Sequence, residues 1–435
     1  MNETWTNWAG DQRCAPVRVA RPGSEAELVE VVGRAAAEGQ QVRAVGSGHS
    51  FSDIACTDGV LVDLSRMQRL LEADRPSGVV TVEAGIKLHA LGAALAEHGL
   101  ALENQGDIDR QALAGALATA THGTGARFPN LAAPVIGMRL ISAAGEVVEL
   151  SADADSEALL AARVSLGALG IVSAVTVRCV PIYTLHRHDR PLPLAETLAG
   201  LDEAVDGNDH FEFFVFPYTE TALTRSTRRS AEEPVPTPAW RRRIQEDLVE
   251  NRVLALTCRT GRVFPRAVPR LNRMMSAAMS ESEVQDRAYR VYATTRNVRF
   301  TEMEYAIPRN RARDAVEQVL GLIERRRLPI LFPLEVRFAA GDDALLSTAH
   351  ERDTCYIAVH QFTGMEFESF FRGVEAIMDG FDGRPHWGKR HYQTSATLRE
   401  RYPEWGRFQA VRARLDPAGV FTNDYTRRVL GPVET

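Results

Sequence analysis

The residues with the clearest chemical potential lie at 42–53, where a short apolar segment runs into a glycine-rich loop. Val42–Val45 reads as a strand, and the loop that follows is Gly46-Ser47-Gly48-His49-Ser50-Phe51. Because glycine has no Cβ, the backbone N–H groups of such a loop can approach a bulky anion, and His49 would lie beside the same ligand. The same residue types are also common in tight surface turns. Phe51 replaces the third glycine of a Rossmann fingerprint, so a dinucleotide here would be bound by loops between strands.

Two further segments are rich in small residues. Almost every side chain from 112 to 125 is small, and this segment ends in Thr121-His122-Gly123-Thr124-Gly125 after an earlier Gln105-Gly106-Asp107. A third glycine-spaced loop, residues 165–172, leads into a predicted strand at Val172–Val180. Each segment alone could reflect only close packing of a helix on a sheet. Successive cradles of small residues in one domain favour a long ligand that lies across it.

Charged residues alternate with apolar ones in two later predicted strands. Pro333–Phe338 carries Glu335 and Arg337, and Tyr356–His360 ends in a histidine. Residues two apart in a strand share a sheet face, so these three polar side chains could lie together. The charged face of a strand is usually solvated, and the two strands alone favour that interpretation. The later loop Pro385-His386-Trp387-Gly388-Lys389-Arg390-His391 groups two histidines and two cations.

The histidines also raise the question of a metal site. His386 and His391 are badly spaced for one helix face, and neither has a cysteine or a carboxylate close by in the sequence. His186-Arg187-His188 is an isolated pair of histidines. No metal site is predicted, and a zinc-dependent hydrolase remains only a minor alternative.

The surrounding pattern mixes helices and strands. Ser24-Glu25-Ala26-Glu27 is a capping box that predicts a helix to about Gly39, and a second helix is expected from Leu88 to His98, ended by Gly99. Further strands are expected at 60–64, 79–82 and 211–216, a hairpin at 134–150, an exposed loop at 232–238 and an amphipathic helix at 315–326. Pro181 closes the first region, so we place a domain boundary there.

The composition excludes several classes of protein. The 435 residues suggest two domains or three, and 45% hydrophobic with 25% charged residues is ordinary for a globular protein. A net charge of −6 argues against a nucleic-acid partner. There is no long apolar run and no signal-peptide pattern, and the five scattered cysteines fit reduced thiols. A cytoplasmic protein, at most peripheral to a membrane, is expected.

Taken together, the motifs resemble those of one family. In chain order they are Val45-Gly46-Ser47-Gly48-His49-Ser50, Ala120-Thr121-His122-Gly123-Thr124-Gly125, Ser165-Leu166-Gly167-Ala168-Leu169-Gly170, Glu335-Val336-Arg337 and His386-Trp387-Gly388-Lys389. This order resembles the sugar-1,4-lactone oxidoreductases of the vanillyl-alcohol-oxidase (VAO) flavoprotein superfamily, which include L-gulono-1,4-lactone and D-arabinono-1,4-lactone oxidases. The sequence is most similar to actinobacterial members, over nearly the whole chain.

The resemblance implies an α+β, two-domain FAD-binding fold of the PCMH/VAO type. An FAD-binding domain of two subdomains would span residues 1–181, an α+β cap domain over the flavin residues 182–410, and a C-terminal segment returning to the FAD domain residues 411–435. The glycine-rich loops would then form the FAD cradle. His49 occupies the position that is commonly joined covalently to the flavin 8α-methyl group, although some relatives bind FAD without that bond.

The resemblance also implies roles for individual residues. The catalytic group would be Glu335, Arg337 and Lys389, with substrate contacts from Asp107, His360 and His386. Either Lys389 or Arg337 would stabilise the negative charge of the reduced flavin, and Glu335 would accept a hydrogen bond from a sugar hydroxyl. The expected FAD contacts are Gly46, Ser47, Gly48, His49, Ser50, Phe51, Gly106, Asp107, Gly115, Thr119, Thr121, His122, Gly123, Gly125, Gly170 and Ile171.

Two neighbouring residues bear on the electron acceptor and the substrate. Gly106 matches a position where relatives that react with oxygen tend to carry glycine and dehydrogenases a larger residue, so it favours an oxidase. Asp107 stands where several relatives have serine, which leaves the preferred substrate open. The acceptor could be O2 or a redox carrier.

The function implied by the resemblance is FAD-dependent oxidation of an aldono-1,4-lactone at its C2 hydroxyl by hydride transfer to flavin N5, as in ascorbate-type pathways. The alternative enzyme is an alditol oxidase, which uses a similar Glu-x-Arg and lysine set on open-chain polyols. A flavin-binding module without catalysis is a third reading, and the intact Glu335, Arg337 and Lys389 set argues against it.

Overall fold

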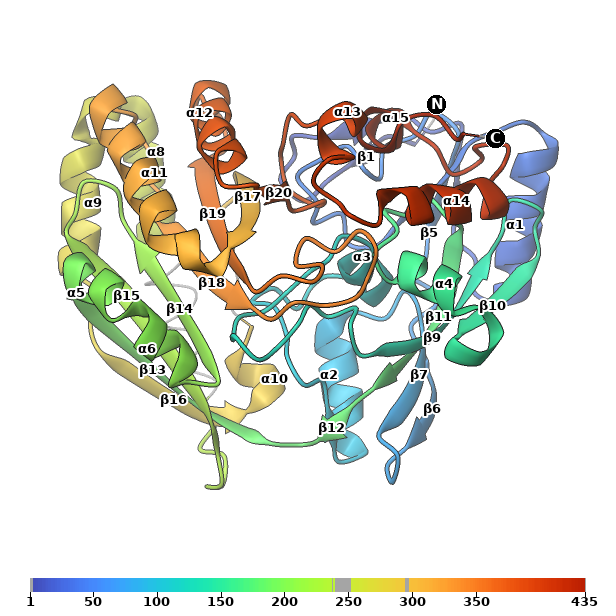
Figure 1. Cartoon of the computed structure of the whole chain (residues 1–435), viewed down its shortest axis with the longest axis horizontal. Helices are drawn as coiled ribbons and strands as arrows, with labels where there is room; N and C mark the ends of the chain where they lie inside the picture. The colour runs from blue at the N-terminus through green and yellow to red at the C-terminus, as the bar shows by residue number, and fades with distance from the viewer. Residues whose placement is uncertain (1–2, 237, 239–251, 294–296, 435) are drawn as a thin grey trace.

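The protein has an α+β architecture of two lobes, each built on its own β-sheets (Figure 1). The computed structural model describes residues 3–236, 238, 252–293 and 297–434. Residue 237, within the loop predicted at 232–238, lies outside the described residues. No helix of the described residues is long and apolar enough to cross a membrane.

Two larger sheets build the first lobe, and the two-stranded pairs β1 (Trp5–Thr6) with β2 (Arg13–Cys14) and β8 (Leu100–Ala101) with β12 (Val180–Pro181) add to them. A three-stranded parallel sheet has the order β3-β5-β4, and a five-stranded antiparallel sheet has the order β10-β9-β11-β7-β6. The strands are β3 (Arg18–Ala20), β4 (Val42–Val45), β5 (Val60–Asp63), β6 (Leu70–Asp74), β7 (Val79–Glu83), β9 (Val135–Ile141), β10 (Val147–Ser151) and β11 (Ile171–Arg178). The predicted strands and the predicted hairpin of this region are therefore confirmed, with small shifts at their ends.

The helices of this lobe also follow local sequence signals. Helix α1 (Glu25–Ala37) begins as predicted, because the Ser24 Oγ accepts a hydrogen bond from the Glu27 N–H at 3.2 Å. Helix α2 (Leu88–Glu97) ends just before Gly99, whose φ of +70° lies in the left-handed region that glycine adopts freely. The remaining helices are α3 (Leu113–Ala118) and α4 (Ala152–Arg163).

A single eight-stranded antiparallel sheet forms the centre of the second lobe. Its order is β16-β13-β15-β14-β18-β19-β17-β20. The strands are β13 (Thr184–Pro193), β14 (His210–Val215), β15 (Thr221–Ser230), β16 (Ser282–Arg287), β17 (Phe300–Pro308), β18 (Leu334–Ala339), β19 (Thr354–Phe362) and β20 (Arg384–Pro385). Helices α5 (Leu194–Ala199), α6 (Leu201–Asp206), α11 (Ala312–Arg326) and α12 (Glu368–Asp379) lie along one side of it (Figure 1).

The two faces of this sheet differ in chemistry because side chains alternate along each strand. Phe213, Val336 and Ile357 belong to one buried apolar cluster with the inner faces of α11 and α12. The opposite face carries acidic and basic side chains and turns toward the first lobe. There Gly125 pairs with Ala339 as an isolated bridge, and its N–H donates to the Phe338 carbonyl at 2.7 Å. The charged face is thus enclosed between the lobes.

The end of the chain returns to the first lobe. Helices α13 (Ser395–Leu398), α14 (Trp405–Leu415) and α15 (Asp424–Leu430) lie on the right-hand side of Figure 1. The buried Arg43 guanidinium donates to the Phe421 carbonyl at 2.8 Å, and the Asn423 Nδ2 donates to the Ile54 carbonyl at 3.1 Å. These bonds tie the C-terminal segment to strand β4 and the loop after it. The exact domain limits at residues 181 and 410 stay a prediction.

Candidate active site

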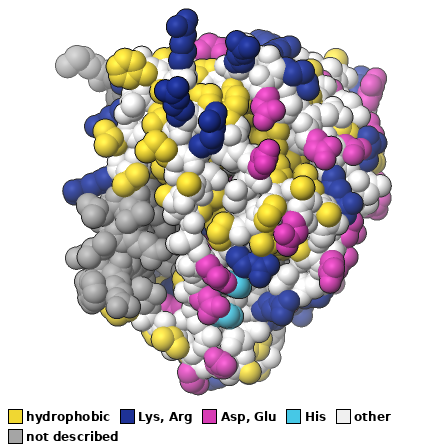
Figure 2. Space-filling view, turned by 90° about the vertical axis from the view of Figure 1, so that its left-hand side faces the viewer, with side chains coloured by type: hydrophobic (Ala, Val, Ile, Leu, Met, Phe, Trp, Pro, Cys, Tyr) yellow, Lys and Arg dark blue, Asp and Glu magenta, His cyan; other side chains and the backbone are white. Residues whose placement is uncertain are grey.

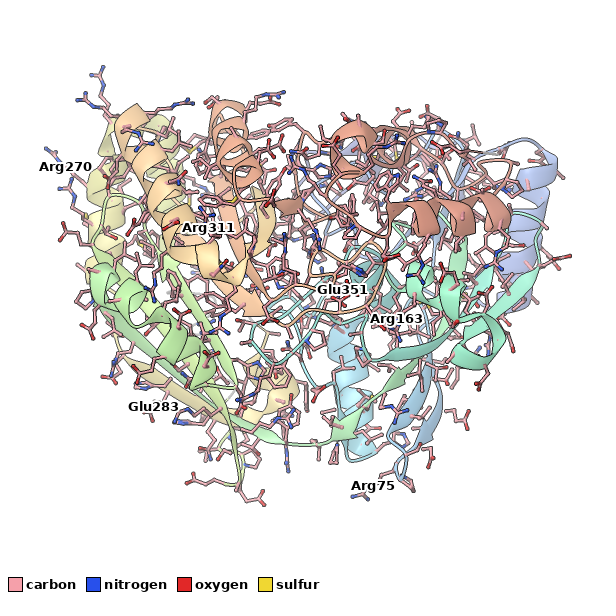
Figure 3. The ribbon with its side chains drawn as sticks, in the orientation of Figure 1. Arg75, Arg163, Arg270, Glu283, Arg311 and Glu351 are labelled. Atoms are coloured by element: carbon pink, nitrogen blue, oxygen red, sulfur yellow. The ribbon has the colours of Figure 1, made fainter. Side chains whose placement is uncertain are left out.

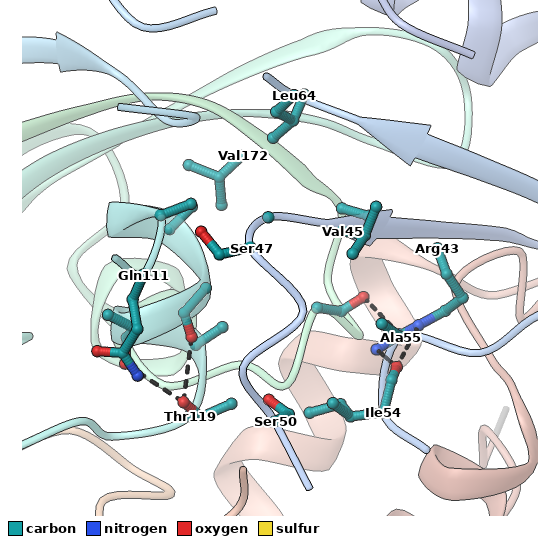
Figure 4. Close-up of a pocket in the computed structure, with 18 of the residues that line it drawn as sticks. Arg43, Val45, Ser47, Ser50, Ile54, Ala55, Leu64, Gln111, Thr119 and Val172 are labelled. Atoms are coloured by element: carbon teal, nitrogen blue, oxygen red, sulfur yellow. Dashed lines mark hydrogen bonds between the residues drawn. The ribbon is translucent and has the colours of Figure 1, made fainter. Parts of the chain in front are cut away.

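A long cavity lies in the first lobe between the loop after β4, helix α3 and the loop at 165–172. The empty space along it, open solvent included, is about 960 Å³. In Figure 4, Ser47 and Ser50 line one side, with Gln111 and Thr119 across from them. Eight of the predicted cofactor contacts line this cavity, namely Gly46, Ser47, Gly48, His49, Ser50, Gly115, Thr119 and Gly170.

The wall formed by residues 47–50 is suited to an anion. Within the described chain, none of the four backbone N–H groups of Ser47, Gly48, His49 and Ser50 donates a hydrogen bond to another residue. Gly48 has a φ of +66°, a left-handed conformation that turns successive N–H groups toward one side. Across the cavity, a Cβ added at Gly115 would meet nothing within 4 Å. The loop and the glycine leave room and donors for a bulky phosphate-bearing ligand.

Lys87 stands next to this loop, and the sequence analysis did not single it out. Its Nζ donates to the Ser47 Oγ at 2.9 Å, and that hydroxyl in turn donates to the Arg110 carbonyl. Burial lowers the pKa of Lys87, with Asp63 opposing the shift. Composition alone could have pointed to Lys87, because Lys87 and Lys389 are the only lysines among the 51 lysine and arginine residues of the chain.

His49 is half-buried at one end of the cavity and is neutral. Its ring stacks on Trp8 with centroids 5.5 Å apart. Burial lowers its pKa to about 4, helped by the nearby charges of Lys389 and Lys87. The loop that carries it is fixed by the N-terminal segment, since the Trp8 N–H donates to the Gly48 carbonyl at 2.8 Å. A neutral imidazole keeps the lone pair that bonding to a carbon atom requires.

The other predicted cofactor contacts lie outside the wall of this cavity. The segment after α3 leads to the junction between the lobes and contains Thr121, His122, Gly123 and Gly125. Gly106 lies next to this segment, because an added Gly106 Cβ would meet the His122 carbonyl at 3.2 Å. Ile171 is a buried core residue on β11. Phe51 is buried against Phe300, and the Lys389 Nζ lies 5.2 Å from its ring centre.

Arg337 on β18 is surrounded by carboxylates. Its Nε donates to the Glu212 Oε2 at 2.8 Å, its Nη2 lies 3.1 Å from the Asp107 Oδ2, and it also pairs with Glu335. Glu335 and Arg337 are only 5% and 8% exposed. The prediction that the charged strand face is solvated is therefore wrong. Burial is tolerated because each charge finds a partner across neighbouring strands and from the facing lobe.

Lys389 forms a second charged group beside the first. Its Nζ lies 2.5 Å from the Glu302 Oε1 and 3.6 Å from the Glu304 Oε2, both on β17. Burial disfavours the ammonium, but the two glutamates outweigh it and raise the pKa of Lys389. Burial likewise opposes ionisation of Glu302, yet Lys389 and His360 lower its pKa to about 2. Lys389 is therefore a fixed cation at neutral pH, unsuited to act as a base.

A third group joins His122, Glu304 and His386. The His122 Nε2 lies 2.7 Å from the Glu304 Oε1, and its Nδ1 lies 2.8 Å from the Gly123 carbonyl. Both partners can only accept, because attraction to His122, acting against burial, lowers the pKa of Glu304 well below its usual value. Both nitrogens of the His122 ring therefore face an acceptor oxygen, one from each lobe. Its ring stacks on Tyr356 with centroids 3.4 Å apart.

The structure brings together three possible metal ligands that were not considered as a set from the sequence. The ligand atoms of His122, Glu304 and His386 lie within 4.8 Å of one another. Both His122 nitrogens already lie within hydrogen-bond distance of a protein oxygen, and the His386 Nδ1 accepts from the Gly388 N–H at 3.0 Å. The geometry is that of an ion-paired hydrogen-bond cluster. His391 lies apart from it, against the Tyr425 hydroxyl at 3.1 Å.

His360 and Asp107 lie close to the catalytic candidates. The His360 Nε2 is 3.5 Å from the Glu302 Oε1 and 4.0 Å from the Glu335 Oε2. His360 therefore lies between Glu302, the partner of Lys389, and Glu335, the partner of Arg337. Asp107 reaches the same group from the first lobe. The predicted residues Glu335, Arg337, Lys389, His360 and Asp107 are thus brought together.

Glu212, Glu302 and Glu304 complete this group, and they were missed. Glu302 and Glu304 alternate with apolar residues on β17, as Glu335 and Arg337 do on β18, and Glu212 lies among phenylalanines on β14. The alternation was visible, but the strand order that places them beside Lys389 and Arg337 was not.

Burial of neutral histidines makes the fold sensitive to acid. Burial lowers the pKa of His210 to about 4 from an ordinary 6.5. Between pH 6.5 and 4, His210 therefore binds a proton in the unfolded chain but not in the folded chain, and the free energy of unfolding falls as pH drops through this window. We expect His210→Asn to reduce the slope of unfolding free energy against pH by about 1.4 kcal/mol per pH unit in this window. Urea titrations at several pH values would measure it, and an unchanged slope would contradict the assignment.

Comparison with known proteins identifies the architecture. The D-arabinono-1,4-lactone oxidase family matches residues 175–429, and the FAD binding domain family matches residues 16–151. An L-gulono-1,4-lactone dehydrogenase of Mycobacterium tuberculosis is 64% identical over 432 residues, which are 99% of this chain and 100% of that protein. The chain belongs to the D-arabinono-1,4-lactone oxidase family. It is an FAD-dependent oxidoreductase, and the long cavity of the first lobe is suited to that cofactor.

More distant relatives agree with this membership. L-gulonolactone oxidase of Mus musculus is 33% identical over 97% of each chain, and an alditol oxidase of a Streptomyces species is 32% identical over 99% of this chain and 100% of that protein. A cholesterol oxidase from Brevibacterium sterolicum has the same fold, with a TM-score of 0.87, 17% identity, and coverage of 99% of this chain and 97% of that one. The predicted α+β FAD-binding fold with a cap domain is confirmed.

Proposed function

We propose that this member of the family oxidises an aldono-1,4-lactone of the L-gulono or D-arabinono type at its C2 hydroxyl. The observation that carries the proposal is the enclosed group of Glu335, Arg337 and Lys389, which lies where the charged face of the second lobe meets the FAD-binding lobe. Bound FAD would supply the hydride acceptor for this oxidation. The residues of this chain then have to bind the sugar, orient its hydroxyl and stabilise charge.

Arg337 and Glu335 orient the substrate in this proposal. A guanidinium forks onto two oxygens at once, so Arg337 is suited to the hydroxyl and ring oxygens of a lactone. The Glu335 carboxylate accepts the hydrogen bond of the reacting hydroxyl and so directs its proton away from the carbon. Glu212 and Asp107 hold Arg337 from two sides, at 2.8 and 3.1 Å. We propose that Asp107, His360 and His386 shape the rest of the site.

Lys389 supplies the fixed positive charge. Because Glu302 and Glu304 raise its pKa, the ammonium stays protonated through the reaction and stabilises negative charge that develops next to it. Glu302 and Glu304 are positioning residues, since they act through Lys389.

We propose that His49 forms the covalent bond to FAD. Yellow colour that stays with acid-precipitated protein, and moves to the supernatant in His49→Ala, would support the bond. Colour in the supernatant from the unchanged protein would rule it out.

Lys87 is proposed to balance the charge of the FAD pyrophosphate. Its ammonium adjoins the hydroxyl of Ser47, in the loop whose four N–H groups face the cavity. We expect Lys87→Met to weaken FAD binding about tenfold, because one charge-assisted hydrogen bond contributes roughly 1.5–3 kcal/mol. Titration of FAD into the apoprotein of a His49→Ala background would measure the affinity without a covalent bond. Arg110→Met is the matched control. The Arg110 carbonyl also contacts the Ser47 hydroxyl, but its side chain is exposed and pairs with Asp109. Equal affinities would contradict the role.

The electron acceptor is proposed separately from the substrate. Gly106 lies beside the segment 121–123 near the junction of the two lobes, and an added Cβ would meet the His122 carbonyl at 3.2 Å and the Thr121 methyl at 3.5 Å, so a methyl group fits there only if the backbone shifts by a few tenths of an ångström. Its small size favours access of O2, whereas the 64% identical relative is named a dehydrogenase. Oxygen uptake during lactone turnover, compared between the unchanged protein and Gly106→Ala, distinguishes O2 from a redox carrier.

Steady-state rates test the substrate class. We expect L-gulono-1,4-lactone or D-arabinono-1,4-lactone to give a higher kcat/KM than xylitol. A higher kcat/KM for xylitol would instead favour the alditol oxidase alternative, to which the 32% identity with the Streptomyces alditol oxidase also points. Bound FAD that no sugar reduces would leave only the non-catalytic alternative.

A further inference from the structure

A helical hairpin at the outer edge of the second lobe carries an unusual surface. It consists of α8 (Leu254–Val263), a 3-10 turn (Pro265–Ala267) and α9 (Val268–Ala277), at the far left of Figure 1. Five of the nine exposed large hydrophobic residues of the described chain lie on it: Val253, Leu256, Val263, Phe264 and Met274. The last four are 63–68% exposed. We call the outer side of residues 252–277 the hairpin surface.

The charge of the hairpin surface is entirely positive. Residues 252–280 contain six arginines and no aspartate or glutamate, in a chain whose net charge is −6. The arginines are Arg252, Arg259, Arg262, Arg266, Arg270 and Arg273. None of the six forms an ion pair with a described residue, and the Arg262 guanidinium lies over the Phe362 ring, 5.6 Å from its centre. Arg270 points away from the body at the outer edge in Figure 3, and Figure 2 shows Lys and Arg side chains among hydrophobic ones in the upper part of this face.

The exposed side chains form stripes on a firmly attached element. Val253, Leu256 and Val263 recur at helical spacing along α8, as Arg266, Arg270 and Met274 do into and along α9. The inner side is packed, because Cys258 and Val268 belong to a buried cluster with Phe51, Phe300 and Phe332. The Asn272 Nδ2 also donates to the Ile330 carbonyl at 2.8 Å. The outer stripes are therefore held in place by a packed interior.

We propose that the hairpin surface docks this protein on the anionic face of a lipid bilayer. Single hydrophobic side chains that stand out between cations suit the boundary between headgroups and acyl chains, where each apolar group inserts and each guanidinium meets a phosphate. The six arginines, spread along the hairpin from residue 252 to residue 273, match a plane of negative charge, which a single small anion does not present. The proposal is independent of which sugar the active site oxidises.

The test is co-sedimentation of the FAD-loaded protein with phosphatidylcholine vesicles, with and without phosphatidylglycerol. We expect binding only when phosphatidylglycerol is present, and weaker binding at high salt. The triple variant Arg266→Glu/Arg270→Glu/Arg273→Glu is expected to lose at least about tenfold in binding, because each cation near the surface contributes roughly 1 kcal/mol. Leu256→Ser/Phe264→Ser/Met274→Ser is expected to weaken binding by a similar factor, and both variants should keep bound FAD and a native thermal transition.

The matched control changes the same residue types at the opposite end of the molecule. Leu71→Ser/Arg75→Glu alters the β6–β7 hairpin, and Figure 3 shows Arg75 far from Arg270. This variant is expected to bind vesicles as the unchanged protein does. No binding, equal binding to both kinds of vesicle, or equal binding by all variants would overturn the proposal. Self-association that the hairpin variants abolish, without vesicle binding, would also overturn it and assign the surface to a second copy.

Discussion

Replacing Lys389 by methionine is expected to lower kcat for lactone oxidation by about 10²–10³, the range for removal of one preorganised charge or donor from an active site. The side chain keeps its approximate length but loses the ammonium charge. Glu302, at 2.5 Å, and Glu304, at 3.6 Å, would then add uncompensated negative charge where further negative charge develops. Stopped-flow reduction of the bound flavin by the lactone measures this step directly.

Two further variants separate catalysis from folding. The double variant Lys389→Met/Glu302→Gln removes both partners of the pair, and we expect it to regain thermal stability but not the rate. Arg390→Met removes a neighbouring cation that pairs with Asp11 at 2.7 Å, and it should reduce flavin at a nearly unchanged rate. Flavin reduction at the unchanged rate in Lys389→Met with bound FAD would refute the role given to Lys389.

Replacing Arg337 by alanine is expected to have the largest effect on both stability and activity. Asp107, Glu212 and Glu335 all pair with this guanidinium in a buried setting. Removing one partner of a buried ion pair typically costs about 3–5 kcal/mol, because the remaining charges lose their compensation. We also expect kcat/KM to fall by at least about 10³, since the forked contact that orients the substrate is lost.

Conservative and neighbouring changes make this prediction specific. Arg337→Lys keeps the charge without the fork, so we expect it to recover part of the stability while KM stays raised. Arg225→Ala removes another buried arginine of the same sheet face, which pairs with Asp189 at 2.8 Å and Glu212 at 3.0 Å. It should lower thermal stability but leave flavin reduction largely intact. If Arg337→Lys restored full kcat/KM, the forked contact would not be needed.

Much of the fold could be predicted because its signals are local. The helix start at Ser24, the glycine that ends α2 and the hairpin around Gly145 each depend on a few neighbouring residues, and all three are confirmed. The reciprocal half of the capping box does not form, because the Glu27 carboxylate accepts from the Gly23 N–H and not from the Ser24 N–H. The loop at 46–50 was also visible, since glycine spacing after a strand is a short-range pattern. Part of the cavity wall, the loop at 46–50 with Gly115, Thr119 and Gly170, was therefore predicted from sequence.

The charged centre depended on contacts that no local pattern reports. His122 and Glu304 are 182 residues apart, and Arg337 and Asp107 are 230 apart. The strand face bearing Glu335 and Arg337 is buried only because the first lobe faces it, which alternation along one strand cannot reveal. Lys87 carried a compositional signal as one of two lysines, but its contact with Ser47 depends on how the strand before α2 lies beside the loop.

Anaerobic titration of the purified, FAD-loaded protein with L-gulono-1,4-lactone and D-arabinono-1,4-lactone tests the central claim most directly. We predict that one of these lactones bleaches the visible flavin absorbance in a single turnover, and that Arg337→Ala and Lys389→Met slow the bleaching while the cofactor stays bound. Bleaching by xylitol but by neither lactone would contradict the proposed substrate class. Bleaching by a lactone at equal rates in all three proteins would contradict the proposed site.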